Sequence, residues 1–488
     1  MIRELFFRPV DAASLAVFRI VFGALLLFES INYGIFLCLD CMYRETDLLF
    51  KYHHFEWVRM LPGPGLELVF VVMGLAATGV MLGLFYRLSA VVLVLSFGYL
   101  FLLDQALYLN HFYLALLFAT ILVFVPAHRY ASLDARRRPE IASATVPNWG
   151  RFWLGAQLEI VLVYAGFVKL NNDWLNLEPM RLWMNNASVD EAALFQWLTQ
   201  DFGIAAASYG AIALHLIGAP LLLWRRTRFV VFWVYAVFHT INAFVFNIGI
   251  FPWMTLGVTL MLFDPDWPRQ VLRWFQARGK LLRFDTFART VEVPAATTAN
   301  AMASAASAVS AVSGARPASR ASFAAATAIS TPWRIFIVVG VSVWLVLQLT
   351  VPLRHFTAPG NVAWNEDGHR FSWRMKLRSK RGKATFYVQR EDGLRLVVDP
   401  ATHLNRKQVR KMACIPDLIW QFAQFLEEQH SDHGRYEVTV HVDTLCSLNT
   451  REPAPLVDRL VDLTTIERSG PVTEWVTPLS KSLPDPMF

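Results

Sequence analysis

The feature that most constrains this chain is a series of apolar runs, each long enough to cross a lipid bilayer. A bilayer core needs about 17 to 25 apolar residues in a helix. Such runs lie near 13–35, 66–86, 88–104, 111–127, 152–170, 207–224, 229–248 and 334–352, and a shorter run at 250–263 is expected to be a ninth. No small-residue cleavage site follows the first run, so we expect it to be an uncleaved span. The sequence therefore predicts a mainly α protein, a multi-pass transmembrane bundle of about eight or nine helices that crosses a lipid bilayer.

Composition agrees with a membrane protein and argues against other classes. The chain is 55% hydrophobic and 17% charged. Its net charge of +7 is not gathered into basic blocks interleaved with aromatics, so no nucleic acid partner is expected. Four cysteines (Cys38, Cys41, Cys414 and Cys446) make no disulfide framework at this length, and no set of residues has the spacing of a metal site. A transporter is disfavoured because no pair of Gly/Pro-broken spans repeats across two halves.

The sequence divides into four parts. A transmembrane helical domain is expected at 1–290, an Ala/Ser-rich linker without large apolar residues at 291–332, and the last span at 333–352. The remainder, 353–488, reads as a small α+β domain. A hairpin is expected around Asp392-Gly393, an amphipathic helix at 406–428 with an interruption at Pro416, and a strand at 436–448.

The distribution of Lys and Arg between loops predicts the orientation. With the N-terminus inside and nine spans, the inside loops hold 17 of these residues and the outside loops hold four. Because short cytoplasmic loops are enriched in Lys and Arg, the N-terminus and the 264–333 loop are expected in the cytoplasm. The domain from 353 onward would then be exoplasmic, in the periplasm or a lumen.

Polar residues inside apolar sequence are the candidate functional groups, because burying them in a membrane is costly. Four places in the predicted topology bring such groups to the outer end of the bundle. They are Asn110 and His111, Lys169, His239 with Asn242, and Arg354 with His355. Each also has a plainer interpretation. Lys169 could extend its amine to the lipid headgroups, and the histidines could be interior residues that form hydrogen bonds within the bundle and have no catalytic role. The composition argues against a headgroup role for Lys169, because the chain has nine Lys and 36 Arg, and an arginine could serve there equally well. A lysine differs from an arginine in that burial can lower its pKa and make it a base.

Several motifs resemble the vitamin K-dependent γ-glutamyl carboxylase family. They follow one another from the first span to about residue 465. The motifs are GVMLGLFYRLS (79–89), YLFLLD (99–104), NHFYL (110–114), YAGFVKLNNDW (164–174), FHTINAFVFNIGIF (238–251), LTVPLRHF (349–356) and the stretch Trp364–Met375. The resemblance implies a membrane domain of the HTTM type followed by the family's luminal domain.

The resemblance also implies an activity and its residues. Members oxidise reduced vitamin K, a naphthoquinone hydroquinone, with O₂ to the epoxide, and use the base so generated to carboxylate protein glutamate with CO₂. The implied catalytic residues are Lys169 as the base, with His111 and Asn110. The expected substrate-binding residues are His355, Arg354, Trp364, His239 and Asn242. An isoprenoid quinone would arrive from the lipid, a glutamate-containing peptide or protein would arrive from outside, and no metal is needed.

One alternative stays open on the sequence alone. The chain could be a quinone-binding membrane protein of the same fold, with another redox role or with no carboxylase activity. The heavy use of arginine points to a bacterial homologue, in which the quinone would be a menaquinone and the membrane the bacterial inner membrane.

Overall fold

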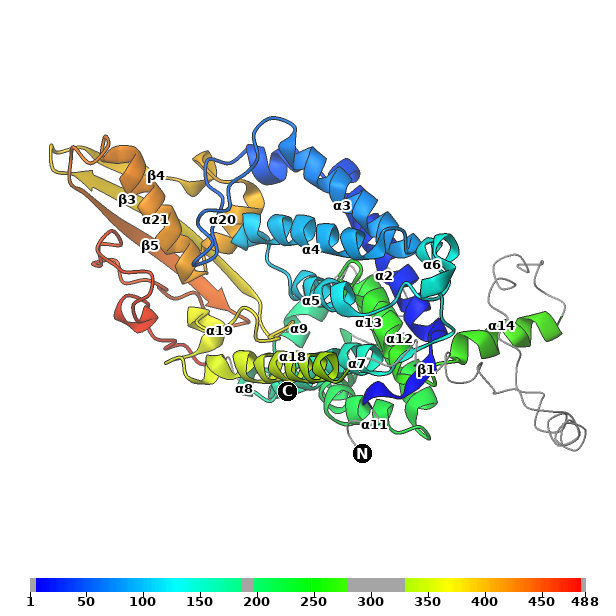
Figure 1. The fold of residues 1–488 in the computed structure, drawn as a ribbon. Coiled ribbons are helices and arrows are strands. Elements are labelled where there is room, and N and C mark those ends of the chain that lie inside the picture. The colour runs from blue at the N-terminus through cyan, green and yellow to red at the C-terminus, as the bar shows by residue number, and fades with distance from the viewer. Residues whose placement is uncertain (1–5, 187–196, 198, 247, 279–329, 484–488) are drawn as a thin grey trace, which may run out of the picture.

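The structure is a computed structural model that describes residues 6–186, 197, 199–246, 248–278 and 330–483. A helical bundle makes up most of the molecule, and a small domain of strands and helices, here called the outer domain, lies at one end of it (Figure 1). The predicted linker at 291–332 falls outside the described residues, except for its last three positions.

Each predicted apolar run contains a helix. In chain order these helices are α2 (Ala13–Ile31), α3 (Gly65–Leu82), α4 (Tyr86–Leu103), α5 (Asn110–Phe124), α7 (Trp149–Phe167), α10 (Asp201–Ala213) with α11 (Ala219–Leu223), α12 (Arg228–Phe246), α13 (Phe251–Thr259) and α18 (Thr331–Thr350). Among the described residues, six helical segments are long and apolar enough to cross a membrane, and α5 and the segment that begins with α13 are apolar but shorter. The helix α7 belongs to neither group. The mainly helical membrane fold is therefore confirmed.

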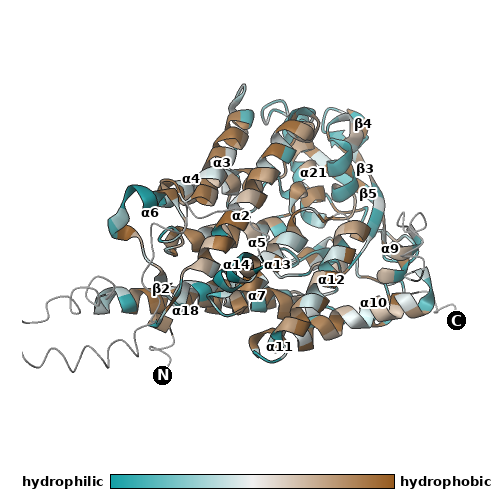
Figure 2. Cartoon of the chain, turned by 90° about the vertical axis from the view of Figure 1, so that its right-hand side faces the viewer, coloured by the Kyte–Doolittle hydropathy of each residue, from teal (hydrophilic) through white to brown (hydrophobic). Residues whose placement is uncertain are grey.

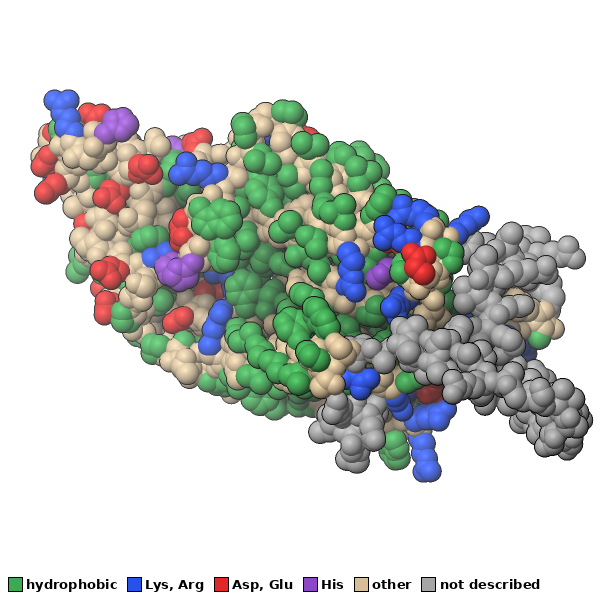
Figure 3. Space-filling view, in the orientation of Figure 1, with side chains coloured by type: hydrophobic (Ala, Val, Ile, Leu, Met, Phe, Trp, Pro, Cys, Tyr) green, Lys and Arg blue, Asp and Glu red, His purple; other side chains and the backbone are tan. Residues whose placement is uncertain are grey.

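The surface has the pattern of a membrane protein. Hydrophobic side chains gather over the middle of the face seen in Figure 3, and charged side chains gather at its two ends. The short helix α6 (Leu133–Arg137) and α14 (Trp267–Ala277) lie at the end opposite the outer domain (Figure 1). Two of the arginine-rich loops predicted to share one side of the membrane are thus at the same end of the bundle.

Close packing fixes the first helices of the bundle. Gly23 of α2 lies so near the backbone of α3 that a Cβ would be 2.6 Å from the nitrogen of Met81, so no larger residue fits there. Arg19, although buried, donates two hydrogen bonds, to the carbonyl oxygens of Ala127 and Ala131. At the start of α4, the carboxylate of Asp134 accepts the backbone N–H groups of Phe85 and Tyr86. These polar contacts hold the helix ends without leaving bare charge in the apolar interior.

The outer domain is built on one antiparallel sheet. Strand β3 (Lys380–Arg390) lies between β4 (Arg395–Val398) and β5 (Val438–Leu448). Helices α20 (Arg406–Met412) and α21 (Pro416–His430) supply apolar side chains to the same core, as does the interior face of β5. The predicted hairpin, the helix interrupted at Pro416 and the last strand are all confirmed. A second, two-stranded sheet of β1 (Pro9–Asp11) and β2 (Thr145–Pro147) was not predicted.

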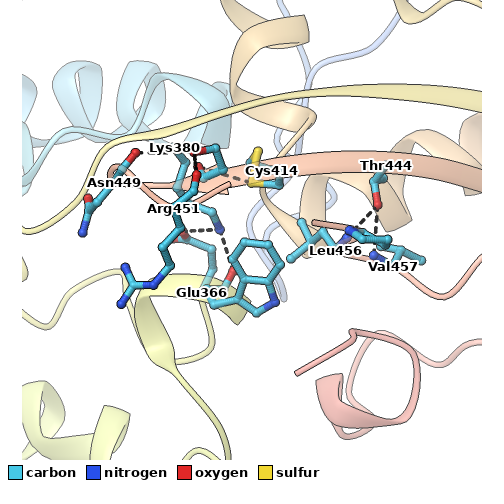
Figure 4. The surroundings of a disulfide bond; sticks show 12 residues. Glu366, Lys380, Cys414, Thr444, Asn449, Arg451, Leu456 and Val457 are labelled. Atoms are coloured by element: carbon cyan, nitrogen blue, oxygen red, sulfur yellow. Dashed lines mark hydrogen bonds and ion pairs between the residues drawn. A yellow bond between two sulfur atoms is a disulfide. The ribbon is translucent and has the colours of Figure 1, made fainter. Parts of the chain in front are cut away.

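The cysteines depart from the sequence expectation. Cys38 is bonded to Cys41, and Cys414 is bonded to Cys446. Figure 4 shows Cys414, whose disulfide joins the segment between α20 and α21 to β5. The expectation failed because Cys414 and Cys446 are far apart in the sequence and meet only when the sheet and helices pack.

Polar contacts join the outer domain to loops of the bundle. Gln408 of α20 donates to Asp104 at the end of α4, over 3.0 Å. Arg451 forms two hydrogen bonds of 2.6 Å to the carboxylate of Asp173, just after α7. Both residues of this second pair are largely buried. The outer domain therefore rests on the ends of the helices that carry the candidate residues.

Candidate active site

An apolar cavity of about 360 Å³ lies within the bundle near the outer domain. Its walls come from the end of α7, from α9 (Met180–Asn186), α10 and α12, and from the start of α13. Most of the lining is aliphatic or aromatic, including Trp174, Trp183 and Phe238. Five side chains bring polar groups to it: Lys169, His215, His239, Asn242 and Lys376.

Lys169 is held at this cavity by the way α7 ends. The helix stops at Phe167, and the chain turns so that the lysine is only 6% exposed. Its Nζ donates to the carbonyl oxygen of Ala165 over 2.6 Å and lies 5.1 Å from the ring centroid of Trp174. Asn171 caps the short helix α8 (Asn172–Leu175) and so sets the position of that ring. Among the described residues, no carboxylate forms an ion pair with Lys169, so its amine has one hydrogen bond and an apolar environment.

Two histidines lie on the same cavity. His215 is part of a π-helical turn (Leu214–Gly218), an irregularity often found at functional sites, and its Nδ1 lies 2.6 Å from the carbonyl oxygen of Ala211. His239 is 2% exposed, and its buried Nδ1 has no hydrogen-bond partner in the described part of the chain. A buried, unpaired ring nitrogen is costly unless a ligand or water satisfies it. His239 thus offers a polar group to a molecule bound in the cavity.

A second cavity of about 540 Å³, here called the basic chamber, adjoins the first. It lies between the bundle and the outer domain, and both Asn110 and His111 line it. Its lining holds five basic side chains and two carboxylates. The basic residues are Arg370, Arg374, Lys376, Arg378 and Lys411, and the acidic ones are Glu29 and Glu366. This excess of positive charge suits an anionic group.

Glu366 neutralises only part of that charge. Its carboxylate is paired with Arg378, and with Lys380 over 3.1 Å. Burial opposes the charge on Glu366, but Arg378 and Lys380 outweigh that effect and hold its pKa well below the usual range. Burial lowers the pKa of Lys411 to about 8, so this lysine still carries charge at neutral pH.

Other buried nitrogens of the chamber make no hydrogen bond in the described structure, although the Nδ1 of His369 lies 4.0 Å from a carboxylate oxygen of Glu366. The Nε of Arg374 and the Nδ1 of His369 are buried and have no hydrogen-bond partner among the described residues. Lys376 points its ammonium at aromatic rings, with Nζ 4.5 Å from the centroid of Phe246 and 5.2 Å from that of Trp183. Within the part of the chain that the structure describes, no acidic residue pairs with Lys376. The chamber therefore has unused donors for a negatively charged ligand.

Backbone strain accompanies this segment. Glu366, Phe371, Trp373 and Lys376 all have positive φ, between +50° and +66°. Residues other than glycine adopt this conformation at a cost, and such residues cluster at functional sites. Here the conformation turns a stretch of chain so that several of its basic side chains face one chamber.

The two cavities meet at residues that line both. These are Phe246, Ile248, Phe251, Met375 and Lys376. The ring of Phe251 lies 5.8 Å from that of His239 and 6.2 Å from that of His111, so it separates the polar groups of one cavity from those of the other. The basic chamber also shares Arg370 and Glu366 with a third cavity of about 350 Å³, which is lined by residues of the outer domain and of the bundle's loops.

The structure sorts the predicted site residues into two groups. Lys169, His239 and Asn242 line the apolar cavity, and Asn110 and His111 line the basic chamber.

Three other predicted residues line neither the apolar cavity nor the basic chamber in the described structure, although Arg354 lines the third cavity. Arg354 donates to the carbonyl oxygen of Arg370, and the Nδ1 of His355 lies 2.6 Å from the carbonyl oxygen of Pro352. Trp364 is in the core of the outer domain. These three residues contact the segment around the chamber and do not reach into it.

Sequence reasoning missed most of the basic chamber. Lys376, Arg378 and Lys411 were not predicted, whereas Arg374 lies in the stretch Trp364–Met375 that carries the family resemblance. In the apolar cavity, His215 was given no role. A signal existed, since basic residues occupy nearly every second position from Arg370 to Lys380. Alternation of basic residues is typical of an exposed strand. In the structure, left-handed backbone conformations interrupt the extended chain, and several of these basic side chains line the chamber.

Two family models match the chain, one for each part of the fold. The HTTM domain matches residues 7–267, which span the bundle up to the start of α14. The domain described as "Vitamin K-dependent gamma-carboxylase, lumenal domain" matches residues 333–482, which cover α18 and the outer domain. No solved structure matches the chain.

Proposed function

The chain belongs to the vitamin K-dependent gamma-carboxylase family, and on this premise we propose that it oxidises a reduced naphthoquinone with O₂ and uses the reaction to carboxylate glutamate in a peptide or protein. In net terms, the quinol and O₂ give the epoxide and water, and a Cγ–H bond of glutamate is replaced by a bond to CO₂. The observation that carries the proposal is the pair of adjoining cavities. One is apolar and holds a buried lysine, and the other is basic and holds His111 and Asn110.

The apolar cavity fits the quinol ring. Its aromatic and aliphatic walls would pack on the naphthalene system and exclude water, which protects a strong base from being quenched. Neutral Lys169 would accept a proton from a quinol hydroxyl, because among the described residues its amine donates only to a backbone carbonyl and has no acidic partner to keep it charged. His239 and Asn242 would orient the quinol oxygens through hydrogen bonds. The oxidation of the quinol supplies the base that removes the glutamate proton.

The basic chamber fits the glutamate. Its side-chain carboxylate would be held by the unpaired donors of Arg374 and Lys376, next to the residues shared with the apolar cavity. Asn110 and His111 would face the glutamate from the α5 side. Peptide would reach the chamber through the third cavity, which opens between the outer domain and the loops of the bundle.

Two features support an exoplasmic position for the outer domain. Disulfides persist in oxidising compartments, and Cys414–Cys446 lies in this domain. The arginine-rich elements α6 and α14 lie at the opposite end of the bundle (Figure 1). We place the outer domain in the periplasm or a lumen and the N-terminus in the cytoplasm.

The test of the base is to replace Lys169. Lys169→Ala should abolish epoxide formation, and Lys169→Arg should be nearly as inactive, because a guanidinium does not give up its proton. Lys383→Ala, at an exposed lysine on β3, is the matched control and should keep wild-type activity. Epoxide is measured by chromatography, together with incorporation of labelled CO₂ into a Glu peptide. Full activity of Lys169→Arg would refute the assignment of Lys169 as the base. Wild-type protein that makes epoxide but never fixes CO₂ would favour the alternative, a quinone-binding membrane protein without carboxylase activity.

A further inference from the structure

The apolar cavity extends to the surface of the bundle between α10 and α12. Ala206 and Gly210 of α10 line the cavity and are also exposed. On α12, Val234 and Val237 line it and are 50% and 59% exposed. Residues that line a cavity and are also exposed at the molecular surface mark the place where the cavity opens.

The opening faces the apolar surface of the bundle. In Figure 2 brown, hydrophobic residues are prominent on α11 and α12, whereas α10 is paler. The segments Asp201–Leu223 and Arg228–Phe246 are among the six described helical segments suited to cross a membrane. Of α12, only Tyr235 and His239 are buried, so most of this helix is at the surface. A ligand leaving the cavity between α10 and α12 would therefore enter hydrocarbon, not water.

Small residues keep the opening wide. Three successive alanines, Ala205–Ala207, are followed one helical turn later by Gly210. A Cβ added at Gly210 would meet no atom within 4 Å, and its backbone is ordinary helix, so a larger residue is tolerated by the fold but would fill the gap. The inner end of the same cavity holds the buried, unpaired Nδ1 of His239. The polar side chain of His239 thus lies at the closed end of the cavity, and apolar side chains line its open end.

We infer that the gap between α10 and α12 is a lateral portal that holds the isoprenoid tail of the quinone while its ring lies near Lys169 and His239. This inference rests on the proposed function and adds the residues that select for the tail. Ala206 and Gly210 form one wall of the portal, and Val234 and Val237 form the other. A ring-bound quinone without a tail would leave the portal empty.

The test compares two ligands and two glycines. Gly210→Trp fills the portal, and Gly340→Trp is the matched control. Gly340 is exposed on α18, and an added Cβ there would also meet no atom within 4 Å. It lines neither the apolar cavity nor the basic chamber. Binding of a naphthoquinone with an isoprenoid tail and of tail-less 2-methylnaphthoquinone is followed by quenching of tryptophan fluorescence, with purified full-length protein in detergent. Trp174, Trp183 and Trp197 line the cavity and report on both ligands.

We expect Gly210→Trp to weaken binding of the tailed quinone at least about tenfold more than binding of the tail-less one, because the tail loses its buried apolar surface. Gly340→Trp should bind both as the wild type does, and Ala206→Trp should repeat the effect of Gly210→Trp. Equal weakening of both ligands, or no weakening of either, would overturn the portal and leave the proposed function standing. Wild-type protein that binds neither quinone would overturn both.

Discussion

Replacing Lys376 tests whether the basic chamber binds the glutamate carboxylate. Lys376→Met keeps the apolar stem beside Phe246 and Trp183 and removes only the charge. A hydrogen bond to a charged group contributes about 1.5–3 kcal/mol, which corresponds to a ten- to hundredfold change in affinity. Arg374 and Lys411 remain in the chamber and can still attract the anion, so the loss should be near the lower end, about tenfold in KM for the peptide.

The assay measures CO₂ fixation and epoxide formation side by side, over a range of Glu peptide concentrations. Lys376→Met should raise the KM for the peptide far more than it changes epoxide formation without peptide, and Lys376→Glu should nearly abolish carboxylation by repelling the carboxylate. Lys383→Met serves as the control, since that lysine is exposed on β3 away from the chamber. An unchanged KM, or an equal loss of both activities, would show that the chamber does not bind the glutamate.

Two further predictions concern stability and topology. Arg451→Ala leaves the carboxylate of Asp173 largely buried without its arginine, which costs about 3–5 kcal/mol and should lower the thermal unfolding midpoint in detergent by roughly 5 °C or more. Arg459→Ala breaks an exposed pair with Asp443 and should change the midpoint little; equal shifts would contradict this reasoning. Protease added to sealed, right-side-out vesicles should digest the domain from Val351 onward and spare residues 294–331, and the reverse pattern would invert the proposed orientation.

The sequence was sufficient for the helices and strands because their signals are local. Apolar length marks a span, and alternation around Asp392-Gly393 marks a hairpin, whatever the rest of the chain does. The same holds for Lys169 and His239, which stand out because they interrupt apolar sequence. Their meeting in one cavity could be anticipated from depth in the membrane, although their roles remain proposals.

The chamber and the disulfide could not be read from the sequence because both depend on distant packing. Arg374 and Lys376 line the chamber on a stretch in which Trp373 and Lys376 adopt positive φ, a conformation that the local sequence does not predict for such residues. Cys414 and Cys446 are 32 positions apart and meet where α20 and α21 join the sheet. His355 was singled out because it follows a span directly, but its ring turns back to Pro352.

The hydrogen bonds and ion pair between the outer domain and the bundle also have a consequence for the order of membrane insertion and folding. Gln408 and Arg451 of the outer domain bind Asp104 and Asp173, which belong to loops synthesised long before them. In the proposed orientation, the bundle would insert with these carboxylates still open to water, and they would be covered only after α18 had crossed the membrane and the outer domain had folded. Under the proposed function, a chain that lacks the outer domain would keep most walls of the apolar cavity but lose Arg374, Lys376 and Lys411, the basic residues proposed to hold the peptide.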